Sequence, residues 1–173
     1  MSKARGLADL GDDFDGTNLT LSGGVYLGGT GSANKLDDYE SGTWTPTAAG
    51  SSGGTMNILV SRARYVKIGQ VVTASATISF NSGSTGVGGL RIFGLPSLPA
   101  TVSQVDLETH GSCMMNNVNF GPTYQTICSY TYSGVDYLYF YGTVDNGNWN
   151  QLQTGLFVNG TAIEFTITYQ TNN

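Results

Sequence analysis

The sequence predicts an all-β fold, with a short N-terminal attachment peptide and trimeric stalk followed by an antiparallel β-sandwich head of the jelly-roll type. Three observations predict it. Apolar and hydroxyl side chains alternate in several segments, Gly, Pro, Asn or Ser bounds each segment, and the connections are too short for helical crossovers. We assign residues 1–45 to the attachment peptide and stalk, and residues 46–173 to the head.

The clearest strand spans residues 72–80, where apolar residues alternate with Thr and Ser. This period of two predicts a strand with one dry face and one hydroxyl-coated face. The same alternation returns at 163–168. Asn159-Gly160 favours a two-residue hairpin turn, because both central residues of such a turn need positive φ. The sequence therefore predicts a final hairpin between 156–158 and the last strand.

Further strands are predicted where β-branched and aromatic residues lie between turn residues. The segment 58–66 also has apolar spacing that suits one face of a helix, but its surroundings favour strands. The predicted strands cover 56–60, 63–68, 90–93, 113–118, 124–132 and 137–142.

The composition argues against two classes of partner. Charged residues make up 11% of the 173 residues, the net charge is −5, and no Lys or Arg follows Arg91. Cations that neutralise phosphates are thus scarce, which argues against nucleic acid as a ligand. No apolar run is long enough to span a bilayer, and the first residues lack a secretory signal, so we expect no membrane insertion and folding in a cytoplasm. We expect Cys113 and Cys128 to be free thiols there.

The first 45 residues contain few large apolar groups. Such a segment cannot close a hydrophobic core by itself. We expect copies from neighbouring chains to pack their narrow apolar stripes together, with glycines allowing close approach of the backbones. The stalk residues expected to make these contacts between copies are Leu19, Leu21, Val25 and Leu27.

Catalytic and metal motifs are weak. The lone histidine, His110, lies near Glu108 and Ser112, but adjacent residues of an extended chain point to opposite sides, so we predict a surface loop and no triad. One His and two distant Cys do not make a zinc site. The segment 145–150 fails the spacing of a calcium loop and is predicted to be a turn that carries an aromatic residue. We therefore expect no catalytic residue, no cofactor and no metal, and no enzyme activity.

Aromatic residues gather late in the chain. Tyr137, Tyr139 and Tyr141 should share one strand face while Leu138 and Phe140 take the core face. The tyrosine face then lies on solvent, on a neighbouring subunit, or on a ligand such as a sugar ring. The candidates for receptor binding or for an inter-subunit contact are Tyr130, Tyr132, Tyr137, Tyr139, Tyr141 and Trp149.

Three motifs in order resemble a module of tail-fibre and related appendage proteins of tailed bacteriophages. They are Leu-Asp-Asp-Tyr-Glu-Ser-Gly-Thr-Trp-Thr-Pro at 36–46, Arg-Tyr-Val-Lys-Ile-Gly-Gln-Val-Val at 64–72 and Gly-Leu-Pro at 94–96. The resemblance implies a homotrimeric virion appendage, trimerised through the stalk and assembled in the host bacterial cytoplasm, whose distal β head adsorbs to a host glycan or outer-membrane protein. The opening 4–11 resembles the lead-in to such stalks, so Leu7 and Leu10 are candidates for contacts with other virion proteins.

Two other classes remain open. The first is a capsid decoration, head-fibre or connector protein without a receptor. The second is a tail spike that degrades polysaccharide with two carboxylates, a geometry that the sequence cannot place.

The carboxylates Asp37, Asp38 and Glu40 precede Trp44 and Pro46. Their like charges disfavour joint burial, so we expect a solvated collar where the stalk widens. A calcium ion held by carboxylates of three chains is the alternative. Trp44 should be the first large core residue of the head, placed as Pro46 turns the chain.

Overall fold

The computed structural model describes residues 23–31, 35–36, 38–101, 108–120 and 124–172. The chain divides into two compact units, Met1–Tyr39 and Glu40–Asn173. The second unit thus begins ahead of the predicted head boundary at residue 46. Four predicted contact residues lie outside the described residues: Leu7, Leu10, Leu19 and Leu21.

In the first unit, two short strands pair antiparallel: β1 (Val25–Tyr26) and β2 (Lys35–Leu36). Val25 is 40% exposed and Leu27 is 60% exposed. These two stalk candidates therefore leave much of their apolar surface uncovered by their own chain.

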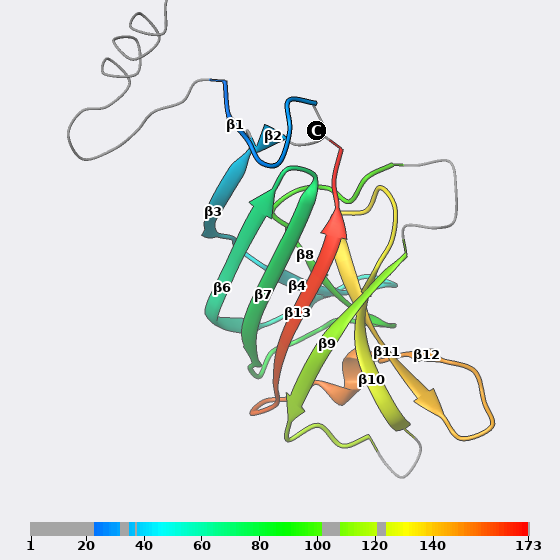
Figure 1. Ribbon diagram of the computed structural model, residues 1–173. Coiled ribbons are helices and arrows are strands. Elements are labelled where there is room, and N and C mark those ends of the chain that lie inside the picture. The colour runs from blue at the N-terminus through cyan, green and yellow to red at the C-terminus, as the bar shows by residue number, and fades with distance from the viewer. Residues whose placement is uncertain (1–22, 32–34, 37, 102–107, 121–123, 173) are drawn as a thin grey trace, which may run out of the picture. The chain divides into compact units, whose positions relative to one another are not determined.

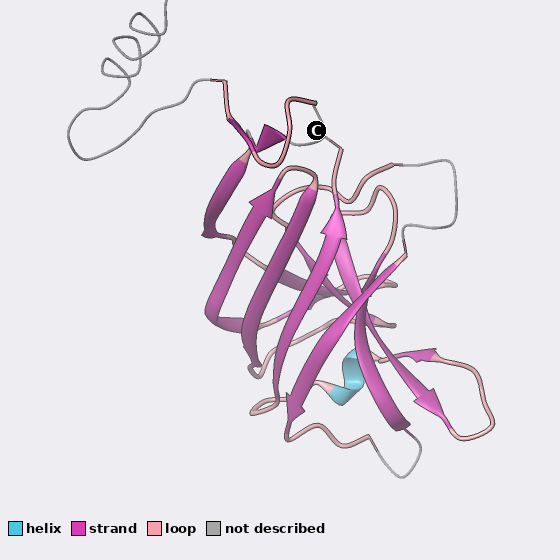
Figure 2. Ribbon diagram, viewed as in Figure 1, coloured by secondary structure: helices cyan, strands magenta, loops and turns pink. Residues whose placement is uncertain are grey.

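The second unit is built on one antiparallel sheet (Figures 1 and 2). Its strand order is β3-β6-β7-β13-β9-β10-β11-β8-β4-β5, and β12 pairs with β11. Within the described residues the helical structure is a single 3₁₀ turn, η3 (Thr154–Leu156). The all-β antiparallel head is confirmed. The strands are β3 (Tyr39–Thr43), β4 (Thr47–Gly50), β5 (Thr55–Met56), β6 (Ile58–Ile68), β7 (Val71–Phe80), β8 (Leu90–Phe93), β9 (Thr109–Asn116), β10 (Tyr124–Thr131), β11 (Tyr137–Val144), β12 (Asn150–Gln151) and β13 (Ala162–Gln170).

The sheet curls so that its two halves face each other across the core (Figure 1). Phe140 of β11 and Phe165 of β13 are separated by β9 and β10 along the sheet, yet their ring centroids lie 5.5 Å apart. The two layers of the predicted sandwich therefore come from one sheet.

The curl is concentrated in β9. This strand pairs with β10 from Thr109 to Ser112 and with β13 from Ser112 to Asn116, so it changes partner within its length. A Cβ on Gly111 would overlap the carbonyl oxygen of Thr166 on β13. Glycine therefore lets the backbones approach where the sheet bends.

The predicted dry face of β7 is confirmed. Its inward side chains are at most 1% exposed: Val72, Ala74, Ala76, Ile78 and Phe80. The prediction for Trp44 is also confirmed, because this residue is 8% exposed, its ring lies 6.3 Å from that of Phe165, and its indole N–H donates to the Ser75 carbonyl oxygen at 3.2 Å. The core is thus the inner face of the curled sheet.

The strand predicted at 156–158 was wrong. Leu156 is instead the last residue of η3, Phe157 and Val158 follow it outside any strand, and the amides of Leu156 and Phe157 donate to the carbonyl oxygens of Gln153 and Thr154. Phe157 is buried and its ring lies 5.0 Å from Phe80. The turn with positive φ at Gly160 is present, but it joins this segment to β13 and does not close a two-stranded hairpin.

The two strands predicted at 56–60 and 63–68 are largely one strand, β6. A bulge lies between Val60 and Arg62 where β6 pairs with β7. A bulge adds one residue and reverses the in-and-out alternation. The bulge explains why the period-two pattern breaks within 58–66 and why the apolar spacing there also suits a helix. The helical alternative for 58–66 was wrong, because the segment lies in β6.

Tyr169 ties β13 to the segment that follows the Gly-Leu-Pro motif. Its hydroxyl donates to the Ser97 carbonyl oxygen at 2.9 Å, and burial raises the pKa of Tyr169 to about 12. Because the folded pKa exceeds the usual value of about 10, the stability from the protonated hydroxyl is complete below pH 10 and is lost as the pH rises toward 12.

We therefore expect the melting temperature to fall between pH 10 and pH 12, and Tyr169→Phe to reduce this fall while lowering stability at pH 8 by about 1 kcal/mol. Thermal unfolding followed by circular dichroism at closely spaced pH values measures both effects. The matched control is Tyr39→Phe, at a residue that is 65% exposed. An equal alkaline loss in Tyr169→Phe and in the unmodified chain would contradict the assignment.

Candidate functional site

The six aromatic candidates lie together on the outer surface of the sheet. We call this group the aromatic face; it comprises Tyr130, Tyr132, Tyr137, Tyr139, Tyr141 and Trp149. On β11 the period of two places Leu138 and Phe140 in the core with no exposed surface. The three tyrosines of β11 then point outward, as predicted.

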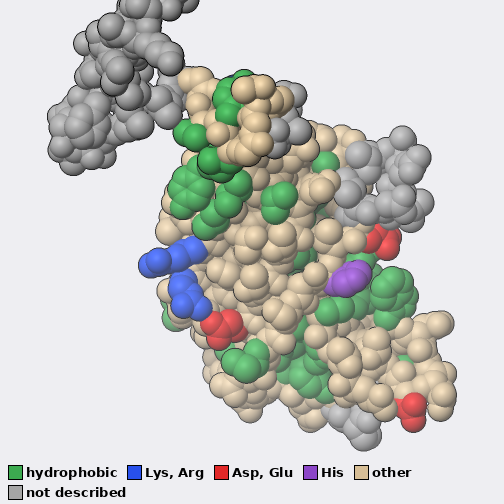
Figure 3. Space-filling model, in the orientation of Figure 1, with side chains coloured by type: hydrophobic (Ala, Val, Ile, Leu, Met, Phe, Trp, Pro, Cys, Tyr) green, Lys and Arg blue, Asp and Glu red, His purple; other side chains and the backbone are tan. Residues whose placement is uncertain are grey.

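Strand register places the members side by side. Tyr139 lies opposite Tyr130 of β10 and opposite Arg91 of β8, and Tyr130 lies opposite His110 of β9. Tyr137 lies opposite Phe93. A continuous outward row therefore crosses four strands, and Figure 3 shows hydrophobic side chains next to the histidine at one end of it.

The rings pack directly on one another. Tyr132 stacks on Tyr139 with centroids 5.9 Å apart and planes 9° apart, and Tyr137 meets Tyr139 edge to face at 5.1 Å. Tyr130 meets Tyr141 edge to face at 5.3 Å. Such offset and edge-to-face pairs are the favoured aromatic geometries, so the rings hold each other in place.

Trp149 extends the aromatic face beyond the sheet. It follows the turn between β11 and β12, which confirms the predicted turn that carries an aromatic residue. Its ring lies 5.8 Å from Tyr141 and 6.2 Å from Tyr130, yet it is 59% exposed. Tyr130 and Tyr139 are almost buried, at 8% and 6%. The latter two form the floor of the aromatic face, and Trp149 is its most accessible ring.

Three hydroxyl groups meet at one side of the aromatic face. The Tyr139 hydroxyl donates to that of Tyr137 at 3.1 Å, and the Tyr132 hydroxyl lies 3.4 Å and 3.5 Å from those of Tyr139 and Tyr137. Burial raises the pKa of Tyr137 and of Tyr139. Hydrogen bonds from Tyr137 and Tyr139, with help from nearby Arg91, lower the pKa of Tyr132. Tyr137 and Tyr139 are therefore neutral donors and acceptors near pH 7.

Arg91 belongs to the same surface, although sequence reasoning did not select it. Its guanidinium carbon lies 4.6 Å from the ring centroid of Tyr137 and 5.3 Å from that of Tyr139. Both distances are within the range of cation–π attraction. The signal in the sequence was the alternation in Leu90-Arg91-Ile92-Phe93, which points Arg91 and Phe93 to the outer side.

His110 was predicted to lie in a loop, and this was wrong: it lies in β9. The prediction that these side chains point to opposite sides was also wrong, because Glu108, His110 and Ser112 are each two residues apart and share the outward side. The α-carbons of successive residues on one side of a strand are about 6.6 Å apart. The Glu108 carboxylate accepts a hydrogen bond from Tyr130, and burial together with this bond raises the pKa of that tyrosine. These residues therefore do not form a triad.

Cys113 and Cys128 are both free thiols. Burial raises the pKa of Cys113 to about 11 and also raises that of Cys128. Both thiols are therefore protonated and weakly reactive near pH 7.

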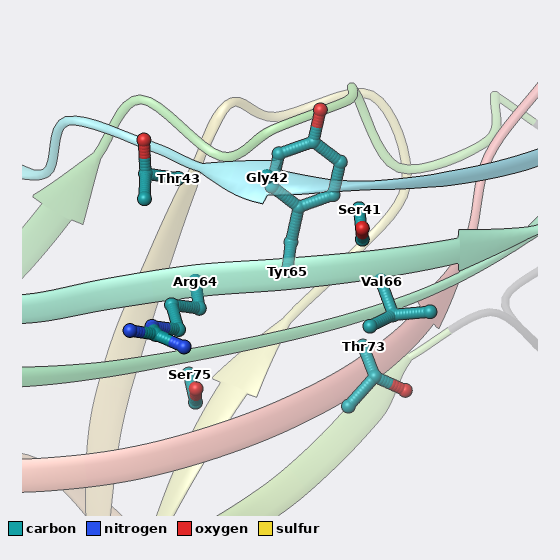
Figure 4. Close-up of a pocket in the computed structure, with 8 residues that line it drawn as sticks. All are labelled: Ser41, Gly42, Thr43, Arg64, Tyr65, Val66, Thr73 and Ser75. Carbon is teal, nitrogen blue, oxygen red and sulfur yellow. The ribbon is translucent and has the colours of Figure 1, made fainter.

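A second feature is a hydroxyl-rich groove of about 420 Å³ at the other end of the sheet (Figure 4). Figure 4 shows the Tyr65 ring beside Gly42, and the Tyr65 hydroxyl donates to the Glu40 carboxylate. Glu40 of the acidic cluster is exposed, whereas Asp37 lies outside the described residues, so the calcium alternative stays a prediction. The groove is lined by Ser41, Gly42, Thr43, Arg64, Tyr65, Val66, Thr73 and Ser75.

Among the described residues, no helix is long and apolar enough to span a membrane, and no three His, Cys, Asp or Glu side chains gather as metal ligands would.

No protein-family model and no curated protein matches this chain. Its structure is similar to part of the crystal structure of the Dettilon tailspike protein, with a TM-score of 0.59 and 17% sequence identity. The match covers 78% of this chain and 24% of the tailspike chain. The chain therefore aligns with about a quarter of that protein, and at this identity the likeness is one of fold.

Proposed function

We propose that this chain is a subunit of a tailed-phage virion appendage and that its β head adsorbs to the host surface. The observation that carries the proposal is the aromatic face, a cluster of six rings on the outer side of the head with Trp149 protruding from it. The fold likeness to a tailspike protein and the three appendage-like motifs support the same assignment.

The chemistry of the aromatic face suits a surface glycan or a protein loop. Tyr and Trp rings supply flat apolar area with polar tips, which fits the apolar faces and hydroxyls of sugars. The rings are already packed against each other, so little side-chain entropy is lost when a ligand binds. The exposed Asn146 and Asn148 in the turn before Trp149 add adaptable hydrogen-bonding groups.

We further propose that the chain acts as a homotrimer, with its N-terminal segment bound to other virion proteins. The support in the first unit is the exposed apolar run Val25, Tyr26 and Leu27. Three weak sites on one assembly bind a repetitive surface far more tightly than one site does. A trimer therefore turns modest affinity into stable adsorption.

Two measurements test this proposal. Light scattering of the purified full chain should give three times the chain mass of 18.2 kDa, and fluorescently labelled protein should bind cells of the host. Protein that stays monomeric at high concentration contradicts the trimer. Protein that decorates virus particles but never cells favours the decoration or connector class, and shortening of purified surface polysaccharide favours a degrading spike.

A further inference from the structure

We propose that the aromatic face recognises a sugar that carries a carboxylate, such as a uronic acid residue of an acidic polysaccharide, and that Arg91 binds the carboxylate. The inference rests on the proposed adsorption function and narrows its ligand. Because the net charge of the chain is −5, attraction of an anion must come from the local surroundings of Arg91.

Strand pairing gives Arg91 one large neighbour and one small neighbour. Tyr139 lies opposite it on β11, and Ala49 lies opposite it on β4. The alanine methyl group is too short to cover a guanidinium. The side chain is half-buried, with its guanidinium stacked against two tyrosine rings and its other side next to a small residue.

The charge of Arg91 is not neutralised by a carboxylate of the described residues. The salt bridge found among those residues joins Arg62 of β6 to Glu164 of β13. The Nε–H group of Arg91 is buried and has no hydrogen-bond partner. This buried group cannot meet a ligand directly, so a carboxylate would contact the terminal N–H groups, which a guanidinium resting on aromatic rings holds in one plane for bidentate contact.

The neighbours of Arg91 favour a sugar acid over a plain anion. The rings beneath the guanidinium belong to Tyr137 and Tyr139, whose hydroxyls meet that of Tyr132 within 3.5 Å. A uronic acid joins a carboxylate to a ring with several hydroxyls, so one sugar residue can contact the Arg91 guanidinium, the aromatic rings and the tyrosine hydroxyls together. A bare carboxylate can contact only the guanidinium.

The other charges at this surface argue against a dense polyanion. Arg91 lies at one end of the outward row of side chains. At the other end Glu108 accepts a hydrogen bond from Tyr130, and His110 lies opposite Tyr130. A nucleic acid or polyphosphate chain laid across the row would meet Glu108 with like charge. A polysaccharide with spaced carboxylates avoids this repulsion.

The test is a ligand-observed NMR titration of the full chain at pH 7 with three probes: sodium glucuronate, glucose and sodium acetate. Glucuronate and glucose differ in the carboxylate, and acetate lacks the sugar ring. We expect the dissociation constant for glucuronate to be at least about tenfold lower than for either control. Arg91→Gln should raise it to the glucose value, and Arg91→Lys, which keeps the charge but loses the planar fork, should recover only part of the loss.

Equal affinity for glucuronate and glucose would overturn the inference, as would equal affinity for glucuronate and acetate, or an unchanged constant in a folded Arg91→Gln variant. Absence of glucuronate binding would also overturn it. Adsorption of labelled protein to cells is measured separately, so the acidic ligand can fail while the adsorption function stands.

Discussion

Trp149→Ala is expected to reduce adsorption of the protein to host cells by about tenfold or more while leaving the melting temperature unchanged. Trp149 is 59% exposed, so its removal opens no cavity in the core. Loss of one aromatic contact costs about 1–1.5 kcal/mol per site, which is close to tenfold in affinity. In the proposed trimer, three linked sites would multiply the effect.

The matched control is Met114→Ala, at an apolar residue of β9 that is 70% exposed and makes none of the ring contacts of the aromatic face. Binding of fluorescent protein to cells, measured by flow cytometry over a concentration series, compares the two variants. If Met114→Ala loses as much adsorption as Trp149→Ala, binding depends on general surface hydrophobicity and the aromatic face is not the site. Tyr141→Phe should keep most adsorption if stacking dominates, because it retains the ring.

Gly111→Ala is expected to lower the free energy of unfolding by about 3 kcal/mol, at the upper end of the usual cost of overpacking. The added methyl group would overlap the Thr166 carbonyl oxygen and crowd the Ser129 hydroxyl at 2.7 Å, and the nearest obstacle is backbone that cannot rotate away. Either β9–β10 or β9–β13 pairing must then loosen. For a chain of this size the loss corresponds to a fall in melting temperature of about 6–12 °C.

Gly155→Ala is the control, because a methyl group there meets no atom within 4 Å and the residue lies in η3. Glycine replaced by alanine in an allowed conformation restricts the unfolded chain and usually stabilises by a few tenths of a kcal/mol or more. Thermal and urea unfolding of both variants test the contrast. A Gly111→Ala chain as stable as the Gly155→Ala chain would show that the sheet does not bend as described.

The sequence by itself determined the type and most positions of the strands. Alternation is a local property, and it fixes which side chains of β7, β11 and β13 point to the core as soon as those segments are extended. The same alternation predicted the tyrosines of β11 on one side and identified Trp44 as a core residue. It failed where local hydrogen bonds replaced a strand, at η3, and where a bulge reversed the pattern, in β6.

Only the tertiary structure decided which strands are neighbours. Register joins β8, β10 and β11, whose residues are up to about 50 positions apart in sequence, and it brings Arg91 over Tyr137 and Tyr139. No local sequence pattern indicates that proximity, because which strands pair depends on how the whole sheet closes around the core. The curl at Gly111 likewise depends on β13, the last strand of the chain. The sequence therefore predicted the aromatic residues of the candidate site, whereas the position of Arg91 beside them and the geometry of the site depend on strand pairing.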